Sequence, residues 1–101
     1  MMRLFVDDER PAPEGWELIT DFREAVRRID QCREKGEPFE GLSLDHDLGG
    51  EDTTRPIIRY LCEEDYWPAV LRVHTANPVG REYLAGMARR YGPATMKVID
   101  R

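Results

Sequence analysis

The 101-residue sequence predicts an α/β domain built on a small, open, parallel five-stranded sheet, with its helices mainly on one face. Short apolar segments alternate with longer segments of helical periodicity in the order β-β-α-β-α-β-α-β. Single helices that join successive strands are typical of parallel sheets with right-handed crossovers. The predicted strands also alternate apolar and polar residues, whereas a parallel strand covered on both faces should be apolar throughout. We therefore expect two layers and one sheet face without helices.

The N-terminal part of the chain predicts two short strands joined by a loop. Residues 3–6 form the first strand and residues 16–19 form the second. Between them, residues 9–15 include two prolines and a glycine, which interrupt any helix. We therefore expect an irregular connection here.

The first predicted helix follows the second strand. Asp21, with Glu24 three residues later, resembles a capping box, and the helix should end near Gly36. Residues 38–41 then lead into the central strand, which carries Leu42-Ser43-Leu44. The apolar stripe of this helix consists of Phe22, Ala25, Val26, Ile29 and Cys32.

The C-terminal half predicts two more helices. One begins near Thr54, with Pro56 tolerated in its first turn. The other begins at Asn77-Pro78, a cap residue followed by proline at the first helical position, and Gly92-Pro93 should end it. The residues expected to face inward are Ile57, Ile58, Leu61, Cys62, Leu84, Met87, Ala88 and Tyr91. The remaining strands are residues 68–73 and 95–99.

Length and composition indicate one domain over residues 1–101, with enough apolar residues for a core. The net charge of −5 argues against non-specific binding to nucleic acid or to an anionic membrane. No apolar run approaches the roughly 18 residues of a membrane span, and the sequence does not start with a signal peptide. We therefore expect a cytoplasmic protein, in which Cys32 and Cys62 are reduced core residues.

Chemically reactive side chains follow three predicted strands at the point where each strand ends. Asp7-Asp8-Glu9 follow the first strand, Asp45-His46-Asp47 the central strand, and His74-Thr75-Ala76-Asn77 the fourth. Ligands of open α/β sheets bind at the carboxyl ends of the strands. We therefore expect these three strand ends to form one site.

These motifs resemble three parts of response-regulator receiver domains, in the right order and spacing over almost the whole chain. Val6-Asp7-Asp8-Glu9 is similar to the acidic pair after the first receiver strand. Residues 44–52 resemble the phosphoacceptor loop, with Asp45 at the phosphoacceptor position. Val73-His74-Thr75-Ala76 resembles the end of the fourth strand, with Thr75 at the hydroxyl position. The resemblance implies a truncated sheet of the flavodoxin/receiver-like type.

The sequence also departs from ordinary receivers. The proline-rich loop replaces the first receiver helix, the last helix has no counterpart, and Lys97 lacks the proline that follows it in the fifth-strand signature. The added residues are similar to those of a divergent group, the cyclic-phosphate-processing receiver domains: His46, His74, Asn77, Gly80 and Arg81. This resemblance implies action on cyclic phosphates.

The acidic residues are candidate metal ligands. Asp7, Asp8 and Asp45 would converge as hard oxygen ligands, which suits Mg²⁺ held by few carboxylates. Without a cation, the three negative charges would repel and at least one pKa should rise. The alternative is that Asp7 and Asp8 are turn and cap residues paired with Arg3 or Arg10.

The two histidines of the chain follow different strands of the predicted site. His46 and His74 can act as acid and base on a phosphodiester, beside a catalytic Asp45, because imidazole titrates near neutral pH. The alternatives are a hydrogen-bonded histidine at a strand end or a metal ligand. Asp47 is a further metal candidate: it either lends its backbone carbonyl to the metal or fixes an imidazole tautomer.

A phosphate subsite is expected beside the cation subsite. Thr75 would donate a hydrogen bond to a phosphate oxygen, unless it is only a satisfied strand-end hydroxyl. Asn77 caps a helix whose free N–H groups attract anions. Gly80 would allow the backbone to approach the ligand, and Arg81 would bind phosphate bidentately unless it is a solvated helix residue.

Two functions fit these residues. The first is a Mg²⁺-dependent phosphoesterase or phosphotransfer domain that acts on a phosphate ester such as a cyclic phosphate. Its partner would be a small phosphate-containing ligand or a nucleotide end. The second is a receiver-like signalling or binding module that accepts phosphate on Asp45 or senses a nucleotide. The two additional histidines favour the enzyme.

The alternation of side chains also predicts the surface opposite the helices. We expect this face to be exposed to solvent or to form a homodimer. It is marked by Arg3, Phe5, Ser43, Arg72 and Lys97.

Overall fold

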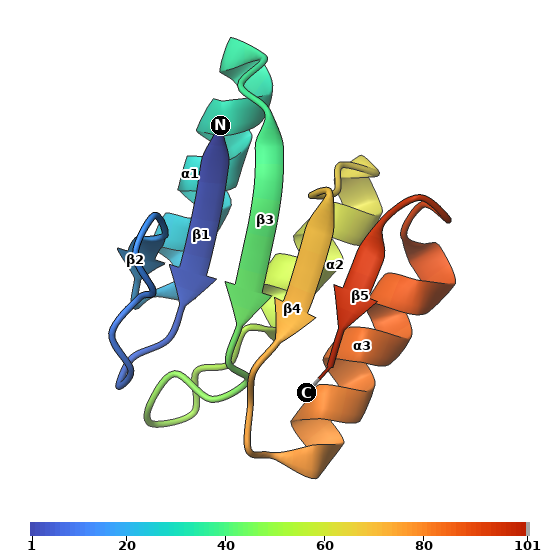
Figure 1. Ribbon diagram of the computed structural model, residues 1–101. Helices are drawn as coiled ribbons and strands as arrows, with labels where there is room; N and C mark the ends of the chain where they lie inside the picture. The colour runs from blue at the N-terminus through green and yellow to red at the C-terminus, as the bar shows by residue number, and fades with distance from the viewer. Residues whose placement is uncertain (101) are drawn as a thin grey trace.

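The computed structural model describes residues 1–100, which form eight helices and strands. They are β1 (Met2–Val6), β2 (Glu17–Ile19), α1 (Phe22–Lys35), β3 (Phe39–Leu44), α2 (Arg55–Glu64), β4 (Val70–Val73), α3 (Pro78–Tyr91) and β5 (Lys97–Ile99). All five strands are parallel and lie in the order β2-β1-β3-β4-β5 (Figure 1). The predicted fold class is confirmed.

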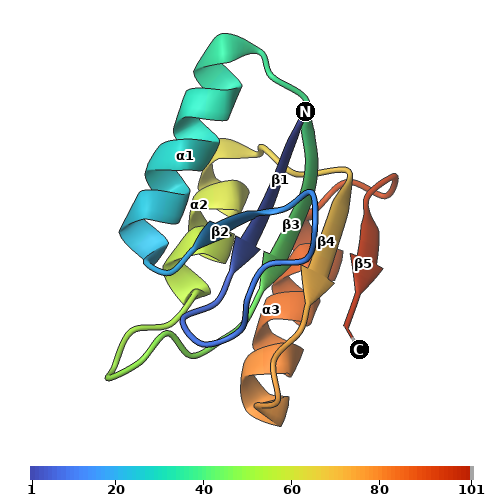
Figure 2. The same ribbon diagram turned by 60° about the vertical axis from the view of Figure 1, so that its left-hand side comes forward.

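The strand order explains why all three helices lie on one face of the sheet. The connection from β1 to β2 steps one way across the sheet, whereas every later connection steps the other way. Right-handed crossovers therefore place the helices on one face and the β1–β2 connection on the opposite face. Figure 1 shows α1, α2 and α3 behind the sheet, and in Figure 2 the irregular β1–β2 connection lies in front of it.

The helix ends follow the predicted caps. Asp21 caps α1 by accepting a hydrogen bond from the N–H of Arg23, and Gly36 ends the helix in a left-handed conformation (φ 66°). Asn77 caps α3 by accepting hydrogen bonds from two N–H groups of the first turn. These contacts satisfy backbone groups that a helix leaves free at its ends. No helix of the described chain is long and apolar enough to span a bilayer.

The core lies between the helices and the sheet. Its fully buried strand residues include Leu4, Val6, Leu42, Leu44, Leu71 and Val73, and α2 contributes Ile57, Ile58 and Leu61. Cys32 is buried, Cys62 is partly buried, and both are free. The prediction is wrong for Tyr91, which is 50% exposed at the last residue of α3. Met96, in the turn before β5, packs beneath Gly92 and fills the core at this end instead.

The expectation for the helix-free face is wrong at its centre. Phe5 and Ser43 are 5% and 1% exposed, while Arg72 and Lys97 are exposed as predicted. The cover is not a helix. The imidazole of His74 stacks on Phe5 and contacts the hydroxyl of Ser43, and farther along the same face the indole of Trp16 lies against Gly41. The homodimer through this face stays a prediction.

We predict that Phe5 and its row neighbour Leu18 contribute very differently to stability. The two residues are paired in the β1–β2 register, yet Leu18 is 45% exposed. Phe5→Ala should lower the free energy of unfolding by about 3–5 kcal/mol, as for other buried phenylalanines. Leu18→Ala should lower it by about 1 kcal/mol or less. Equal, small effects in urea unfolding would show that Phe5 is not covered in solution.

Candidate functional site

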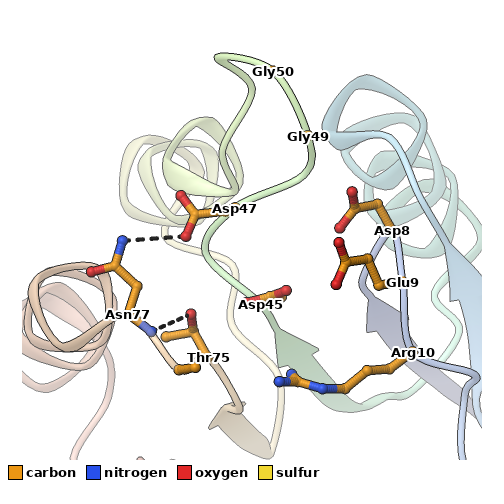
Figure 3. Close-up of a pocket in the computed structure, with 10 residues that line it drawn as sticks. Asp8, Glu9, Arg10, Asp45, Asp47, Gly49, Gly50, Thr75 and Asn77 are labelled. Atoms are coloured by element: carbon orange, nitrogen blue, oxygen red, sulfur yellow. Dashed lines mark hydrogen bonds between the residues drawn. The ribbon is translucent and has the colours of Figure 1, made fainter.

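A polar pocket of about 370 Å³ opens at the carboxyl end of the sheet. It is lined by Asp8, Glu9 and Arg10 after β1, by Asp45, Asp47, Gly49 and Gly50 after β3, and by Thr75, Ala76 and Asn77 after β4. Figure 3 shows these side chains around one space, with Asp45 between the two walls. The chain leaves β1 and β3 in opposite directions here, which is where open α/β sheets bind ligands. The three predicted strand ends therefore form one pocket.

Three carboxylates converge at this pocket. One oxygen from each of Asp7, Asp8 and Asp45 lies within 4.8 Å of the other two. Asp8 is exposed, Asp45 is partly buried and Asp7 is fully buried. A compact group of hard oxygen donors fits Mg²⁺, which is commonly held by few carboxylates and water. The structure thus brings together three of the four predicted metal residues.

Asp7 is held by a dense set of hydrogen bonds. Its Oδ1 accepts the N–H groups of Glu9 at 2.8 Å and Arg10 at 3.0 Å, and its Oδ2 lies 2.9 Å from Nε2 of His74. Burial acts to raise the pKa of Asp7, but these hydrogen bonds outweigh burial and hold the pKa below its usual value. The turn role that the sequence left open is therefore present. Asp7 therefore stabilises the turn and also belongs to the group of three convergent carboxylates.

His74 reaches from the end of β4 across β3 to β1. Its ring stacks on Phe5 with centroids 4.3 Å apart, and its Nδ1 lies 2.7 Å from the hydroxyl of Ser43. Burial lowers the pKa of His74 and outweighs the opposing effect of Asp7, so the imidazole is neutral at neutral pH. A carboxylate only accepts, so Nε2–H donates to Asp7 and Nδ1 accepts from Ser43. The side chain is 8% exposed and does not line the pocket.

His46 is enclosed in the same way, at 5% exposure. Its Nδ1 lies 3.0 Å from the Asp47 carboxylate, and its Nε2 accepts a hydrogen bond from Nε–H of Arg55 at 2.9 Å. Because a guanidinium only donates, Nε2 carries no proton and Nδ1–H donates to Asp47. Arg55 lies over the ring of Tyr83, 4.1 Å from its centroid. Neither histidine has a free ring nitrogen, which is the geometry of a hydrogen-bonded strand-end histidine.

Asp47 joins His46 to the start of α3. Its second carboxylate oxygen accepts a hydrogen bond from the side chain of Asn77 at 3.2 Å (Figure 3). The hydrogen bond from His46, and then that from Asn77, lower the pKa of Asp47. The Asp47 side chain is 59% exposed and stands apart from the three convergent carboxylates. The sequence left two roles open for Asp47, a metal ligand or a residue that fixes an imidazole tautomer. The contact of Asp47 with His46 matches the second role.

The predicted phosphate-binding residues separate into two pairs. Thr75 and Asn77 line the pocket, and the Thr75 hydroxyl accepts the N–H of Asn77 at 3.1 Å. Gly80 lies outside the pocket, packed against the ring of His46, and its N–H is bonded to Asn77. Arg81 donates to the backbone carbonyl of Thr75 at 2.7 Å and lines a different pocket along α3. This contact holds the guanidinium of Arg81 outside the acidic pocket.

Several residues of the site were not among the predicted catalytic, phosphate-binding or metal-binding residues. Glu9, Arg10, Gly49 and Gly50 line the pocket. Ser43 and Arg55 lie behind it and bond the two imidazoles. Two signals were available in the sequence. A serine in a buried strand requires a hydrogen-bond partner, and an arginine at a helix start opposes the helix dipole.

Comparison with known proteins identifies one family. The model of the cyclic-phosphate processing receiver domain matches residues 2–90, which include every residue that lines the pocket. No match was found among curated proteins or solved structures.

We predict that Gly80→Ala destabilises the protein and disturbs the pocket rim. A Cβ at this position would overlap the imidazole of His46, and overpacking of this kind costs about 1–3 kcal/mol. Gly86, on the same helix, is the control because a Cβ there meets nothing within 4 Å. Gly86→Ala should stabilise the protein by up to about 1 kcal/mol through helix propensity. Chemical denaturation of both variants checks this, and two stabilising substitutions would contradict the contact.

Proposed function

The chain belongs to the family of cyclic-phosphate processing receiver domains, and on this premise we propose that it is a metal-assisted phosphoesterase or phosphotransfer domain that acts on a cyclic phosphate. One observation carries the proposal. Three carboxylates converge at an open pocket whose opposite wall presents the Thr75 hydroxyl. The pocket volume lies within the usual range for small-molecule sites.

Asp7, Asp8 and Asp45 would hold the metal ion. Bound Mg²⁺ would offset their charge and stabilise negative charge on a phosphate oxygen. Asp8 and Asp45 line the pocket, whereas Asp7 lies behind them with its orientation fixed by the backbone of the following turn. The donor set therefore combines two accessible carboxylates with one anchored carboxylate.

Asp45 is also the residue that we assign to proton transfer. Its Oδ1 accepts the N–H of His46 at 2.8 Å, and its Oδ2 has no hydrogen-bond partner among residues 1–100. In hydrolysis of a cyclic phosphate, a water oxygen bonds to phosphorus, and one ester oxygen of the ring leaves and gains a proton. The free oxygen of Asp45 would take the proton of the water. In phosphotransfer the same oxygen would instead bond to phosphorus, the P–O bond to one ring ester oxygen would break, and that oxygen would take a proton from solvent water.

Thr75 and Arg10 are assigned to the phosphate group. The Thr75 oxygen accepts a backbone N–H, so its own O–H is free to donate to a phosphate oxygen. Arg10 supplies the positive charge of the pocket lining, and its Nη1 is held by the carbonyl of His74 at 2.8 Å. A charge-assisted hydrogen bond from a guanidinium is stronger than one from a neutral donor.

We assign positioning roles to the histidines in place of acid–base roles. Both ring nitrogens of His46 and of His74 already have partners, and neither side chain lines the pocket. Proton transfer to substrate by either ring would require its hydrogen bonds to break first. Their contacts instead orient Asp47 and Asp7. Histidine–carboxylate contacts of this kind orient ligands in many metal sites.

A receiver-like signalling module is the second candidate. The observation that favours it is the pairing of Asp45 with Thr75 in one pocket, because these are the phosphoacceptor and hydroxyl positions of the resembled receivers. Both candidates use the same cation group. They differ in whether phosphate is released to water or retained on Asp45.

We predict that Mg²⁺ stabilises the fold through the three carboxylates. At about 100 times its dissociation constant, a ligand of the native state adds roughly 2.7 kcal/mol of stability. Asp45→Asn should remove most of this gain, because it removes one charged donor. Glu51→Gln, an exposed acid of the same loop, is the control and should respond like the wild type. Thermal melting in millimolar Mg²⁺ measures the effect, and an unchanged wild-type melting temperature would exclude the cation site.

We also predict that turnover of a 2′,3′-cyclic phosphate requires Asp45 and depends on His74 only through the metal. His74→Ala should weaken Mg²⁺ binding by about 10–100-fold, as for other outer partners of metal ligands. Its turnover number should therefore recover at high Mg²⁺. Steady-state rates over a range of Mg²⁺ concentrations test this.

The outcomes of these rate measurements separate the candidate roles. A loss of about 10²–10⁴-fold that persists at saturating Mg²⁺ would restore His74 as a general acid or base. If wild-type protein turns over no phosphate ester but takes phosphate from a small donor on Asp45, the signalling module replaces the enzyme.

A further inference from the structure

We propose that Ser43 is a positioning residue that acts through His74 to hold Asp7 in the orientation of the cation site. The inference rests on the proposed function, in which Asp7 belongs to the metal-binding carboxylates. Ser43 itself touches neither the pocket nor any of the three carboxylates through a hydrogen bond. Its effect would be transmitted by one imidazole.

The three side chains form a continuous buried chain across the sheet. The hydroxyl of Ser43 lies 2.7 Å from Nδ1 of His74, and Nε2 of His74 lies 2.9 Å from Oδ2 of Asp7. The exposed fractions are 1% for Ser43 and 0% for Asp7, and the His74 side chain is 8% exposed. Water therefore has little access to replace a lost hydrogen bond in this chain.

Hydrogen-bond chemistry allows one direction of donation along the chain. The Asp7 carboxylate accepts only, so Nε2 of His74 carries the ring proton. Nδ1 of the neutral ring then offers a lone pair, and Ser43 donates its hydroxyl proton to it. Alanine at position 43 would leave Nδ1 without a donor and remove one of the two hydrogen bonds that hold the ring. The Nε2–H tautomer would persist, because the Asp7 carboxylate still requires a donor, but the ring could shift and its hydrogen bond to Asp7 would weaken.

The strand register explains why serine occupies this place. Phe5 and Ser43 are paired across β1 and β3 on the helix-free face. The Phe5 ring supports the plane of the imidazole, with 6° between the two rings, while Ser43 contacts one ring nitrogen. Stacking alone leaves the ring free to turn within its plane. The hydroxyl of Ser43, the only serine in the chain, supplies the in-plane contact that fixes the ring opposite Asp7.

The experiment compares Ser43→Ala with Ser43→Thr and with Tyr60→Phe. Tyr60→Phe is the matched control because it also removes one hydroxyl hydrogen bond, to Asp30, but on the helical layer. We expect Ser43→Ala to weaken Mg²⁺ binding by about 10-fold in titration calorimetry. Ser43→Thr, which keeps the hydroxyl, and Tyr60→Phe should bind Mg²⁺ like the wild type.

A second readout uses the imidazole itself and needs no metal. NMR of the wild-type ring should show His74 protonated on Nε2, with the Nε2–H proton shifted downfield and protected from exchange by its hydrogen bond to Asp7. Ser43→Ala should move this proton signal upfield and speed its exchange, and Ser43→Thr should restore the wild-type values. A serine that only fills space would leave the Nε2–H signal unchanged on substitution by alanine.

The two readouts distinguish failure of this inference from failure of the proposed function. If wild-type protein binds Mg²⁺ and Ser43→Ala binds it equally well with an unchanged Nε2–H signal, Ser43 is not a positioning residue. If wild-type protein does not bind Mg²⁺, the proposed cation site is wrong. A changed Nε2–H signal in Ser43→Ala would then still support control of the ring by Ser43, and an unchanged one would overturn it.

Discussion

The burial of the Asp7 carboxylate is the constraint on which most of the site depends. A charged group with no solvent exposure is stable only if hydrogen bonds replace its water. Two backbone N–H groups of the following turn and the imidazole of His74 do so here. The turn begins the irregular β1–β2 connection. The imidazole of His74 also covers Phe5. One buried charge thus organises a pocket wall and part of the helix-free face.

The sequence predicted the fold and the location of the pocket because both follow from local patterns. Helical stripes and short apolar segments identify the elements, and parallel strands bring their carboxyl ends to one edge. The directions of individual side chains do not follow from such patterns. His74 turns back over the sheet instead of into the pocket, because its partners Phe5, Ser43 and Asp7 are distant in sequence. Arg81 bonds the nearby carbonyl of Thr75, a contact that the helical pattern does not determine.

The helix-free face shows what side-chain alternation can and cannot predict. Alternation correctly assigned Arg72 and Lys97 to an exposed face. Alternation does not predict which strand residues will be covered by segments outside the helices and strands. The burial of Phe5 and Ser43 was therefore missed. Phe5 and Ser43 both contact the strand-end His74, and Trp16, at the end of the proline-rich loop, covers Gly41 on the same face. In small two-layer domains, polar residues at such positions can therefore be buried hydrogen-bonding groups.

The two strands at the edges of the sheet are short, and this limits pairing with strands of other chains. β2 and β5, the edges of the sheet, contain three residues each. A sheet edge exposes unpaired N–H and C=O groups that can recruit another strand and lead to aggregation. Edges this short offer few such groups, and Glu17 on β2 and Lys97 on β5 add charge beside them. Both edges therefore offer few backbone groups to another chain, which disfavours edge-to-edge association.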